Sequence, residues 1–341
     1  MKFKLFFGLM VALTLAVGLY GWFQRAVPPP TGRPMTGQQA EPTVAKLAEP
    51  VSAVPSEPVT AKPPRMTTVA MPSEVVTSAV AGLPVPAWSA VQFIVNNRAG
   101  YMARRDAVHS LAGHLTDLDW EQLKSFLLKP DPLDRTQPEQ VLKNALMDVL
   151  CAMNPPPAGL GDVLVQMYRD HQQNEVMRDY AVQHLGAYYE QTTLQPDSAT
   201  ILQSVQKVLW EGTDETYDSI AGTALLALTR LSQEFGADFD RKKIAATAAQ
   251  MAGSAGTGEL THITACQICA QLGNTDALPL VMQLAENGET IPVRMSAIGA
   301  LGSLGTSAQI PFLISVVQGN NDRLKTPAQQ ALNRLKQRLG S

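Results

Sequence analysis

The stretch RMSAIGALGSLG, residues 294–305, decides the fold, because two other parts of the chain repeat its pattern. Residues 104–115 read RRDAVHSLAGHL, and residues 178–187 read RDYAVQHLGA. In each copy an alanine lies at the centre, with an arginine three residues before it and a leucine four residues after it. These three positions fall on one side of an α-helix, so the pattern predicts a recurring amphipathic helix. The central alanines are Ala107, Ala181 and Ala297.

Weaker copies fill the gaps, and together the seven copies predict a chain of helix pairs. The weaker copies centre on Ala145, Ala224, Ala265 and Ala328. A turn and a second amphipathic run follow the copies, and strand signals are absent from this half of the sequence. Such runs cover 118–128, 159–168, 199–210, 276–285 and 308–317. One helix pair cannot bury its apolar face alone, so it stacks on the next pair. We therefore expect an all-α fold over residues 87–341: a right-handed α-solenoid of about six to seven helix-pair repeats.

The two ends of this array need polar surface, and the sequence offers a helix for each end. The run from Trp88 to Asn97 follows Pro86 and is expected to open the array. Residues 327–339 are expected to close it, because their basic side chains suit the C-terminal end of a helix dipole.

Residues 293–317, VRMSAIGALGSLGTSAQIPFLISVV, resemble the HEAT-like repeat, in particular the short form called the PBS-lyase HEAT-like repeat. The resemblance implies that the arginine-bearing helices line the concave side and that each arginine bonds to a neighbouring repeat. The arginines concerned are Arg104, Arg178 and Arg294, with Asp106 and Asp179 as candidate partners. Leu142 and Ala221 take the arginine position in two repeats, which would interrupt such a ladder. The resemblance implies a scaffold role and does not imply a lyase activity, because repeats of this kind serve unrelated functions.

The first 25 residues predict a membrane segment. Residues 5–23 contain no charged side chain, and a helix of that length just spans a bilayer. Two interpretations compete: an uncleaved signal-anchor, which we favour because the run is long, or a signal peptide cut after Ala16-Val17-Gly18. Lys2 and Lys4 hold the N-terminus in the cytoplasm. The anchor predicts a single-pass protein of a bacterial-type inner membrane with its solenoid on the periplasmic side. The signal peptide predicts secretion.

Residues 26–86 predict a disordered linker between the membrane segment and the solenoid. The stretch 27–87 holds 13 of the 24 prolines, and proline denies a helix or sheet its backbone donor. The segment also has too little apolar bulk to form a core. We expect a flexible, partly polyproline-like tether.

One cluster of residues could carry chemistry. His262, Cys266 and Cys269 fall at i, i+4 and i+7 of a predicted helix, where they could hold zinc or copper with a fourth ligand. The interpretation we favour places both cysteines in the apolar core. Acidic residues 211–218 are interpreted as compensation of a helix dipole. GxSxG, P-loop and HExxH motifs do not occur, so we expect no enzymatic activity and no cofactor.

The function that we expect is a non-enzymatic scaffold tethered to a membrane. The net charge of −3 offers no basic footprint for a nucleic acid. The polar, varied residues beside the repeat arginines suit a protein or peptide partner instead. Those residues are Arg105, His109, Gln183 and Gln267. Two alternatives remain: an accessory module of an enzyme or lyase system, and a metal-handling protein that uses His262, Cys266 and Cys269.

Overall fold

The computed structural model describes residues 89–340, apart from 112–114, 132–135, 194 and 196–197. The predicted membrane segment, residues 1–25, and the predicted linker, residues 26–86, lie outside the described residues. The described part belongs to one compact unit, Val80–Ser341. It contains helices and no β-strand, which confirms the all-α fold for the part that the structure describes. None of the helices described there is both long enough and apolar enough to span a membrane.

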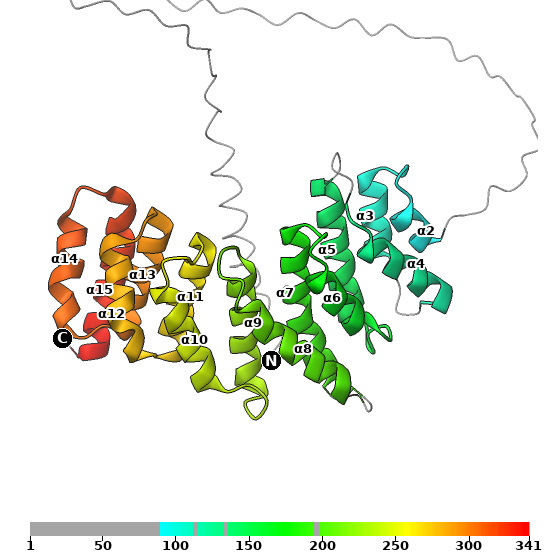
Figure 1. The fold of residues 1–341 in the computed structure, drawn as a ribbon. Coiled ribbons are helices and arrows are strands. Elements are labelled where there is room, and N and C mark those ends of the chain that lie inside the picture. The colour runs from blue at the N-terminus through cyan, green and yellow to red at the C-terminus, as the bar shows by residue number, and fades with distance from the viewer. Residues whose placement is uncertain (1–88, 112–114, 132–135, 194, 196–197, 341) are drawn as a thin grey trace, which may run out of the picture. The chain divides into compact units, whose positions relative to one another are not determined.

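The helices follow one another with short connections (Figure 1). The first seven are α2 (Ala90–Val95), α3 (Tyr101–His109), α4 (Asp117–Leu128), α5 (Thr136–Ala152), α6 (Leu160–Arg169), α7 (Glu175–Thr192) and α8 (Ala199–Gly212). They continue with α9 (Ile220–Glu234), α10 (Arg241–Gly253), α11 (Glu259–Leu272), α12 (Leu278–Asn287), α13 (Ile291–Leu304), α14 (Ile310–Gln318) and α15 (Asp322–Leu339). Short 3-10 helices at Thr275–Ala277 and Ser307–Gln309 lead into α12 and α14.

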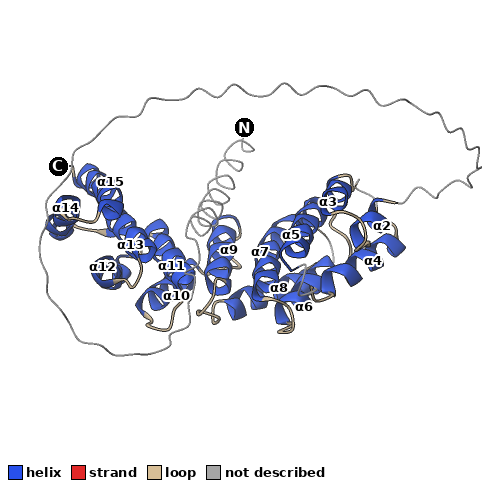
Figure 2. Cartoon of the chain, turned by 90° about the horizontal axis from the view of Figure 1, so that it is seen from above, coloured by secondary structure: helices blue, strands red, loops and turns tan. Residues whose placement is uncertain are grey.

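The helices of this unit form two layers. Each odd-numbered helix from α3 to α15 packs against the next odd-numbered helix, and we call this row the odd layer. The even-numbered helices cover one side of it (Figure 2). Figure 2 also shows the odd layer on the inner side of the bend of this row of helices. The arginine-bearing helices α3, α7 and α13 belong to the odd layer, as the resemblance to HEAT-like repeats implies.

The central residues of the sequence repeat lie in the seams between the odd-numbered helices. Ala181, Ala224, Ala265, Ala297 and Ala328 are all fully buried. Helix α5 differs from the prediction by one residue. Ala145 and Val149 are only partly buried, whereas Leu146 and Leu150 have no exposed surface. The true register of α5 is therefore centred on Leu146, with Lys143 three residues before it.

Side-chain caps fix where several helices begin. Asn174 caps α7, Asp240 caps α10, and Thr290 caps α13, each by accepting a backbone N–H bond from the first turn. Helix α15 starts at Asp322, five residues before the predicted start at 327, because Asn321 accepts a bond from the backbone of Arg323. Pro327 thus lies inside the helix rather than at its start.

Buried cations join neighbouring repeats. Arg104 donates its Nε–H to the carbonyl of Ile94 at 2.8 Å and a second bond to Glu139 at 2.9 Å. Arg178 repeats this arrangement with the carbonyl of Tyr168 at 2.7 Å and with Glu215 at 2.6 Å. Each arginine therefore satisfies a carbonyl at the end of the preceding helix and an acid some 35 residues further on, since the two separations are 35 and 37 residues.

Two predictions about the buried cations were wrong: Asp106 and Asp179 do not pair with the repeat arginines, and α5 does not lack a buried cation. Asp106 forms an exposed pair with Arg105, and Asp179 accepts a bond from Ser219 at 2.6 Å. Lys143 supplies the missing cation of α5, since its Nζ lies 2.7 Å from Asp131 and donates to the carbonyl of Lys129.

Arg294 bonds to a carbonyl of the preceding helix, as Arg104 and Arg178 do, but it has no carboxylate partner among the described residues. It donates its Nε–H to the carbonyl of Ala285 at 3.2 Å. No acid among the described residues pairs with it within salt-bridge distance. The ladder therefore weakens toward the C-terminal end of the row.

The even-numbered helices α8 and α10 pack less closely than most other neighbours in their layer, and the same holds for α12 and α14. Polar contacts bridge the joint between α8 and α10: the Lys243 ammonium lies 3.8 Å from the centre of the Trp210 ring, and Gln206 donates to the carbonyl of Asp238. In the odd layer α9 and α11 approach closely at Gly222, where an added Cβ would lie 3.1 Å from the Thr264 hydroxyl. The two layers are thus held very differently at this joint.

Candidate functional site

The four predicted partner-binding residues lie on three helices of the odd layer. Arg105 and His109 are on α3, Gln183 is on α7, and Gln267 is on α11. The last three are exposed and follow their buried central residue by two positions. Arg105 is 40% exposed and lies 3.4 Å from Asp106. The corrected register of α5 places exposed Asp148 at the same repeat position, between His109 and Gln183. This repeat position is therefore polar and exposed in α3, α5, α7 and α11, with Asp148 an acid that the sequence reasoning missed, whereas α9 carries the partly buried Leu226 there.

A groove opens in the odd layer around Gln267. It has a volume of about 390 Å³ and lies between α11, α13 and α15. Its lining side chains are small or polar, and the surface that they expose in the groove is mainly apolar: Gln267, Ala270, Gln271, Ser296, Gly299, Ala300, Ser303 and Arg334. Arg334 is its only charged lining residue, and its guanidinium lies 3.4 Å from the Ser303 hydroxyl. Amide and hydroxyl groups around small side chains suit an extended peptide, whose backbone offers both donors and acceptors.

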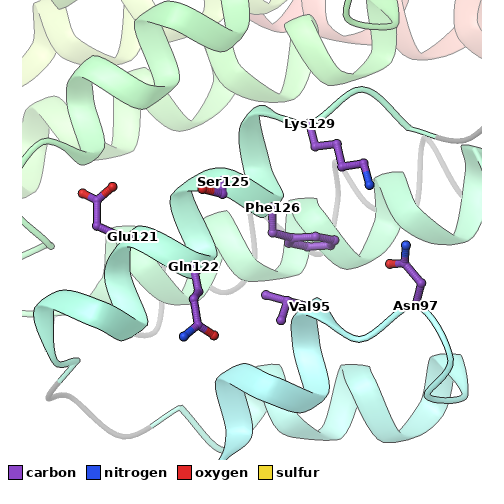
Figure 3. Close-up of a pocket in the computed structure, with 7 residues that line it drawn as sticks. All are labelled: Val95, Asn97, Glu121, Gln122, Ser125, Phe126 and Lys129. Carbon is purple, nitrogen blue, oxygen red and sulfur yellow. The ribbon is translucent and has the colours of Figure 1, made fainter.

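A second hollow of about 400 Å³ lies at the other end of the unit, between α2 and α4. Figure 3 shows Val95 and Phe126 at its apolar centre, with Glu121 and Gln122 at its rim. Arg104 lies beneath it, 5.3 Å from the centre of the Phe126 ring. The accessible surface of this hollow is mainly apolar, although Phe126 itself is buried. No sequence pattern indicated this hollow.

A buried histidine joins α7 to α5. His184 is 2% exposed, and its Nε2 lies 2.9 Å from the Asn144 side-chain oxygen. Burial lowers the pKa of His184 to about 4, although Asp148 lies 3.8 Å from its other ring nitrogen. The imidazole is therefore neutral near pH 7 and links two repeats as a structural residue.

The three candidate metal ligands do not converge. Cys266 and Cys269 are fully buried free thiols in the core, and burial raises the pKa of Cys266 to about 12 and that of Cys269 to about 11. His262 turns to the carbonyl of Ser254, 3.1 Å from its Nε2. In the described part of the chain no group of three His, Cys, Asp or Glu residues is arranged to hold a metal ion. The geometry thus agrees with the core interpretation of both cysteines.

The acidic residues of the segment 211–218 form ion pairs between repeats, in addition to the helix-dipole compensation that the sequence predicted. Glu211 pairs with Arg169 at 2.9 Å, and Glu215 pairs with Arg178. Only Asp218 acts at the start of a helix, where it accepts the backbone N–H of Ile220 at 2.8 Å. Burial raises the pKa of Asp218, and the nearby Glu215 and Glu175 carboxylates add to the increase. The segment is therefore a junction between repeats that also concentrates negative charge.

The two layers of stacked helix pairs in the described part of the chain define a helical repeat protein. Residues 241–333 match the family model of HEAT repeats, which confirms the predicted HEAT-like repeat in this part of the chain. No curated protein matches the chain. A solved structure, human deoxyhypusine hydroxylase in complex with glycerol, is 18% identical over 73% of this chain and 95% of that one. Its TM-score is 0.33, and at that level the likeness carries no argument about fold or function.

Proposed function

We propose that this protein is a non-enzymatic scaffold that binds a protein or peptide partner through its odd layer. The observation that carries the proposal is the groove between α11, α13 and α15, because it contains Gln267, one of the predicted partner-binding residues. Its amide and hydroxyl groups, small side chains and single cation suit a peptide, and exposed His109 and Gln183 add polar positions on α3 and α7 of the same layer. Stacked repeats are well suited to such extended contacts.

The proposal also concerns the subcellular location of the protein. Residues 5–23 would anchor the chain in a bacterial-type inner membrane, and residues 26–86 would let the solenoid reach its partner on the periplasmic side. The support is the uncharged run beside Lys2 and Lys4 together with the proline content of the linker.

A pair of glycine substitutions tests the scaffold proposal. A Cβ added at Gly299 meets nothing within 4 Å, so Gly299→Phe would fill the groove without strain in the backbone. Gly256, in the connection between α10 and α11, has the same free space and serves as the matched control. The full-length variants are expressed in cells, and their crosslinked partners are quantified by mass spectrometry. We expect Gly299→Phe to lower partner recovery at least about tenfold, or 1.4 kcal/mol, and Gly256→Phe to leave it unchanged.

The same experiment can reject the proposal. Recovery that is equal in the two variants, with equal melting temperatures, would show that the groove does not bind the partner. An enzymatic turnover that Gly299→Phe abolishes would favour the enzyme-module alternative instead.

A further inference from the structure

Tyr217 is an aromatic side chain that is almost entirely in solvent. It lies in the loop 213–219 between α8 and α9 and is 88% exposed. The other exposed large apolar residues of the described part are between 36% and 70% exposed. A tyrosine ring in water does not gain the favourable free energy that burial of an aromatic side chain provides. Such rings are typical anchors of protein interfaces.

The loop that carries Tyr217 is held from both sides. On one side Glu215 accepts a bond from Arg178 of α7 at 2.6 Å. On the other side Gly258 donates its backbone N–H to Thr216 at 2.8 Å, and the hydroxyl of Thr261 donates to the carbonyl of Asp218 at 2.6 Å. The loop is therefore pre-organised, and binding at Tyr217 would cost little additional conformational entropy.

The contact with α11 is also sterically specific. A Cβ at Gly258 would come within 2.0 Å of the Tyr217 carbonyl oxygen, so only glycine permits this approach. The position of the Tyr217 backbone is thereby tied to the start of α11.

Further exposed apolar side chains accompany Tyr217 on the same helix ends. Val176 is 43% exposed in the first turn of α7, and Leu260 is 46% exposed in the first turn of α11. These are the two helices that hold the loop. Met102 of α3 and Val141 of α5 take the same repeat position, five residues before the buried central residue, and are also exposed. The exposed apolar residues thus follow the repeat rather than scattering over the surface.

The surroundings of Tyr217 are acidic. Asp214 and Asp218 share its loop, Glu175 precedes Val176, and Glu259 precedes Leu260. Among the residues that the structure describes, no basic side chain lies within salt-bridge distance of these four carboxylates. The local field is therefore negative, since the nearby Arg178 guanidinium is already paired with Glu215, and this favours a cationic partner.

We propose that Val176, Tyr217 and Leu260, with their four neighbouring carboxylates, form a docking edge for a basic segment of a protein partner. The segment places a large apolar side chain against the Tyr217 ring, and its lysine or arginine side chains meet Glu175, Asp214, Asp218 and Glu259. This rests on the proposed function in that a protein partner is bound, but the docking edge shares no residue with the groove around Gln267.

A peptide-display selection tests the docking edge. A random 16-residue peptide library is selected against the immobilised full-length chain, and the enriched peptides are synthesised and titrated. We expect enriched peptides with net positive charge and large apolar residues. Tyr217→Ser should weaken their binding at least about tenfold, since exposed aromatic anchors carry much of an interface energy. Glu175→Gln with Asp214→Asn should flatten the salt dependence of binding.

Two controls separate this inference from the proposed function. Tyr217→Phe keeps the ring and should bind as the wild type does, and Gly299→Phe fills the groove and should leave these peptides bound. Basic peptides that bind Tyr217→Ser with unchanged affinity, or enriched peptides without positive charge, would overturn the docking edge while the scaffold function stands. Failure to enrich any peptide would overturn the docking edge and count against peptide binding by the scaffold as well.

Discussion

At the scale of single residues, buried charge links the repeats. Arg104, Lys143 and Arg178 each donate to a carbonyl at the end of a preceding helix and each face a carboxylate. Arg104 and Glu139 are 3% and 5% exposed, so neither charge is well solvated without the other. A buried ion pair adds little net stability compared with apolar residues, but removal of one partner leaves the other charge uncompensated.

We predict a large difference between two adjacent arginines. Arg104→Met should lower the free energy of unfolding by about 3–5 kcal/mol, because it leaves Glu139 buried and unpaired. Arg105→Met changes a side chain that is 40% exposed and should cost no more than about 0.5 kcal/mol. Urea denaturation of the two variants measures the difference. Equal midpoints would mean that the Arg104–Glu139 pair does not join α3 to α5.

Sequence reasoning found the arginines but not their acids. The repeat pattern identified Arg104, Arg178 and Arg294 because they recur at a fixed distance from an alanine. Glu139 lies within α5, whereas Glu215 lies in the loop before α9, and the separations of 35 and 37 residues differ, so the two acids share no fixed position within the repeat. Asp106 and Asp179 were nearer in sequence, but on a helix they point to other neighbours.

At the scale of elements, helix α13 shows why small residues occur in the seams. It contains Gly299 and Gly302, both in helical backbone. A Cβ at Gly302 would come within 2.9 Å of the Ala331 Cα on α15, whereas a Cβ at Gly299 meets nothing within 4 Å. One glycine therefore permits two helices to approach closely, and the other leaves the groove open.

We expect substitution by alanine to change the stability of the protein with opposite signs at the two glycines of α13. Gly299→Ala should stabilise the protein by about 0.5–1 kcal/mol, because alanine loses less backbone entropy in a helix. Gly302→Ala should destabilise it by about 1–3 kcal/mol, because α15 must move away. Thermal and chemical denaturation of both variants provide the measurement. A stabilising Gly302→Ala would contradict the close packing of α13 on α15.

The sequence predicted these elements with uneven success. Strongly patterned helices such as α4 and α8 were predicted nearly to their ends, since turn residues flank them. The start of α15 was missed because Pro327 resembles a first-turn residue, whereas the cap is Asn321. In α5 the small Ala145 suggested the wrong register, and burial of Leu146 corrected it. The groove around Gln267 could not be predicted, because it depends on how three helices meet.

At the scale of the whole molecule, we predict that residues 5–23 hold the chain on a membrane. Full-length protein should sediment with membranes and keep Met1, because the uncharged run is long enough to span the bilayer as an uncleaved anchor. Deletion of residues 5–23 should release it, whereas deletion of the equally long stretch 40–58 should not. Fractionation and mass spectrometry of the N-terminus give the answer. A soluble protein that begins near Leu19 would instead establish the signal peptide.

The joint between α8 and α10 gives the row a mechanical property. One layer is continuous there through the close approach of α9 and α11 at Gly222, while the other is bridged by Lys243 on Trp210 and by Gln206. Because close packing persists on one side of this joint only, the continuous layer would serve as the pivot of any bending there. Gln183 and Gln267 stand on opposite sides of the pivot. We therefore expect bending at this joint to change the distance between Gln183 and Gln267 on the two sides of the row.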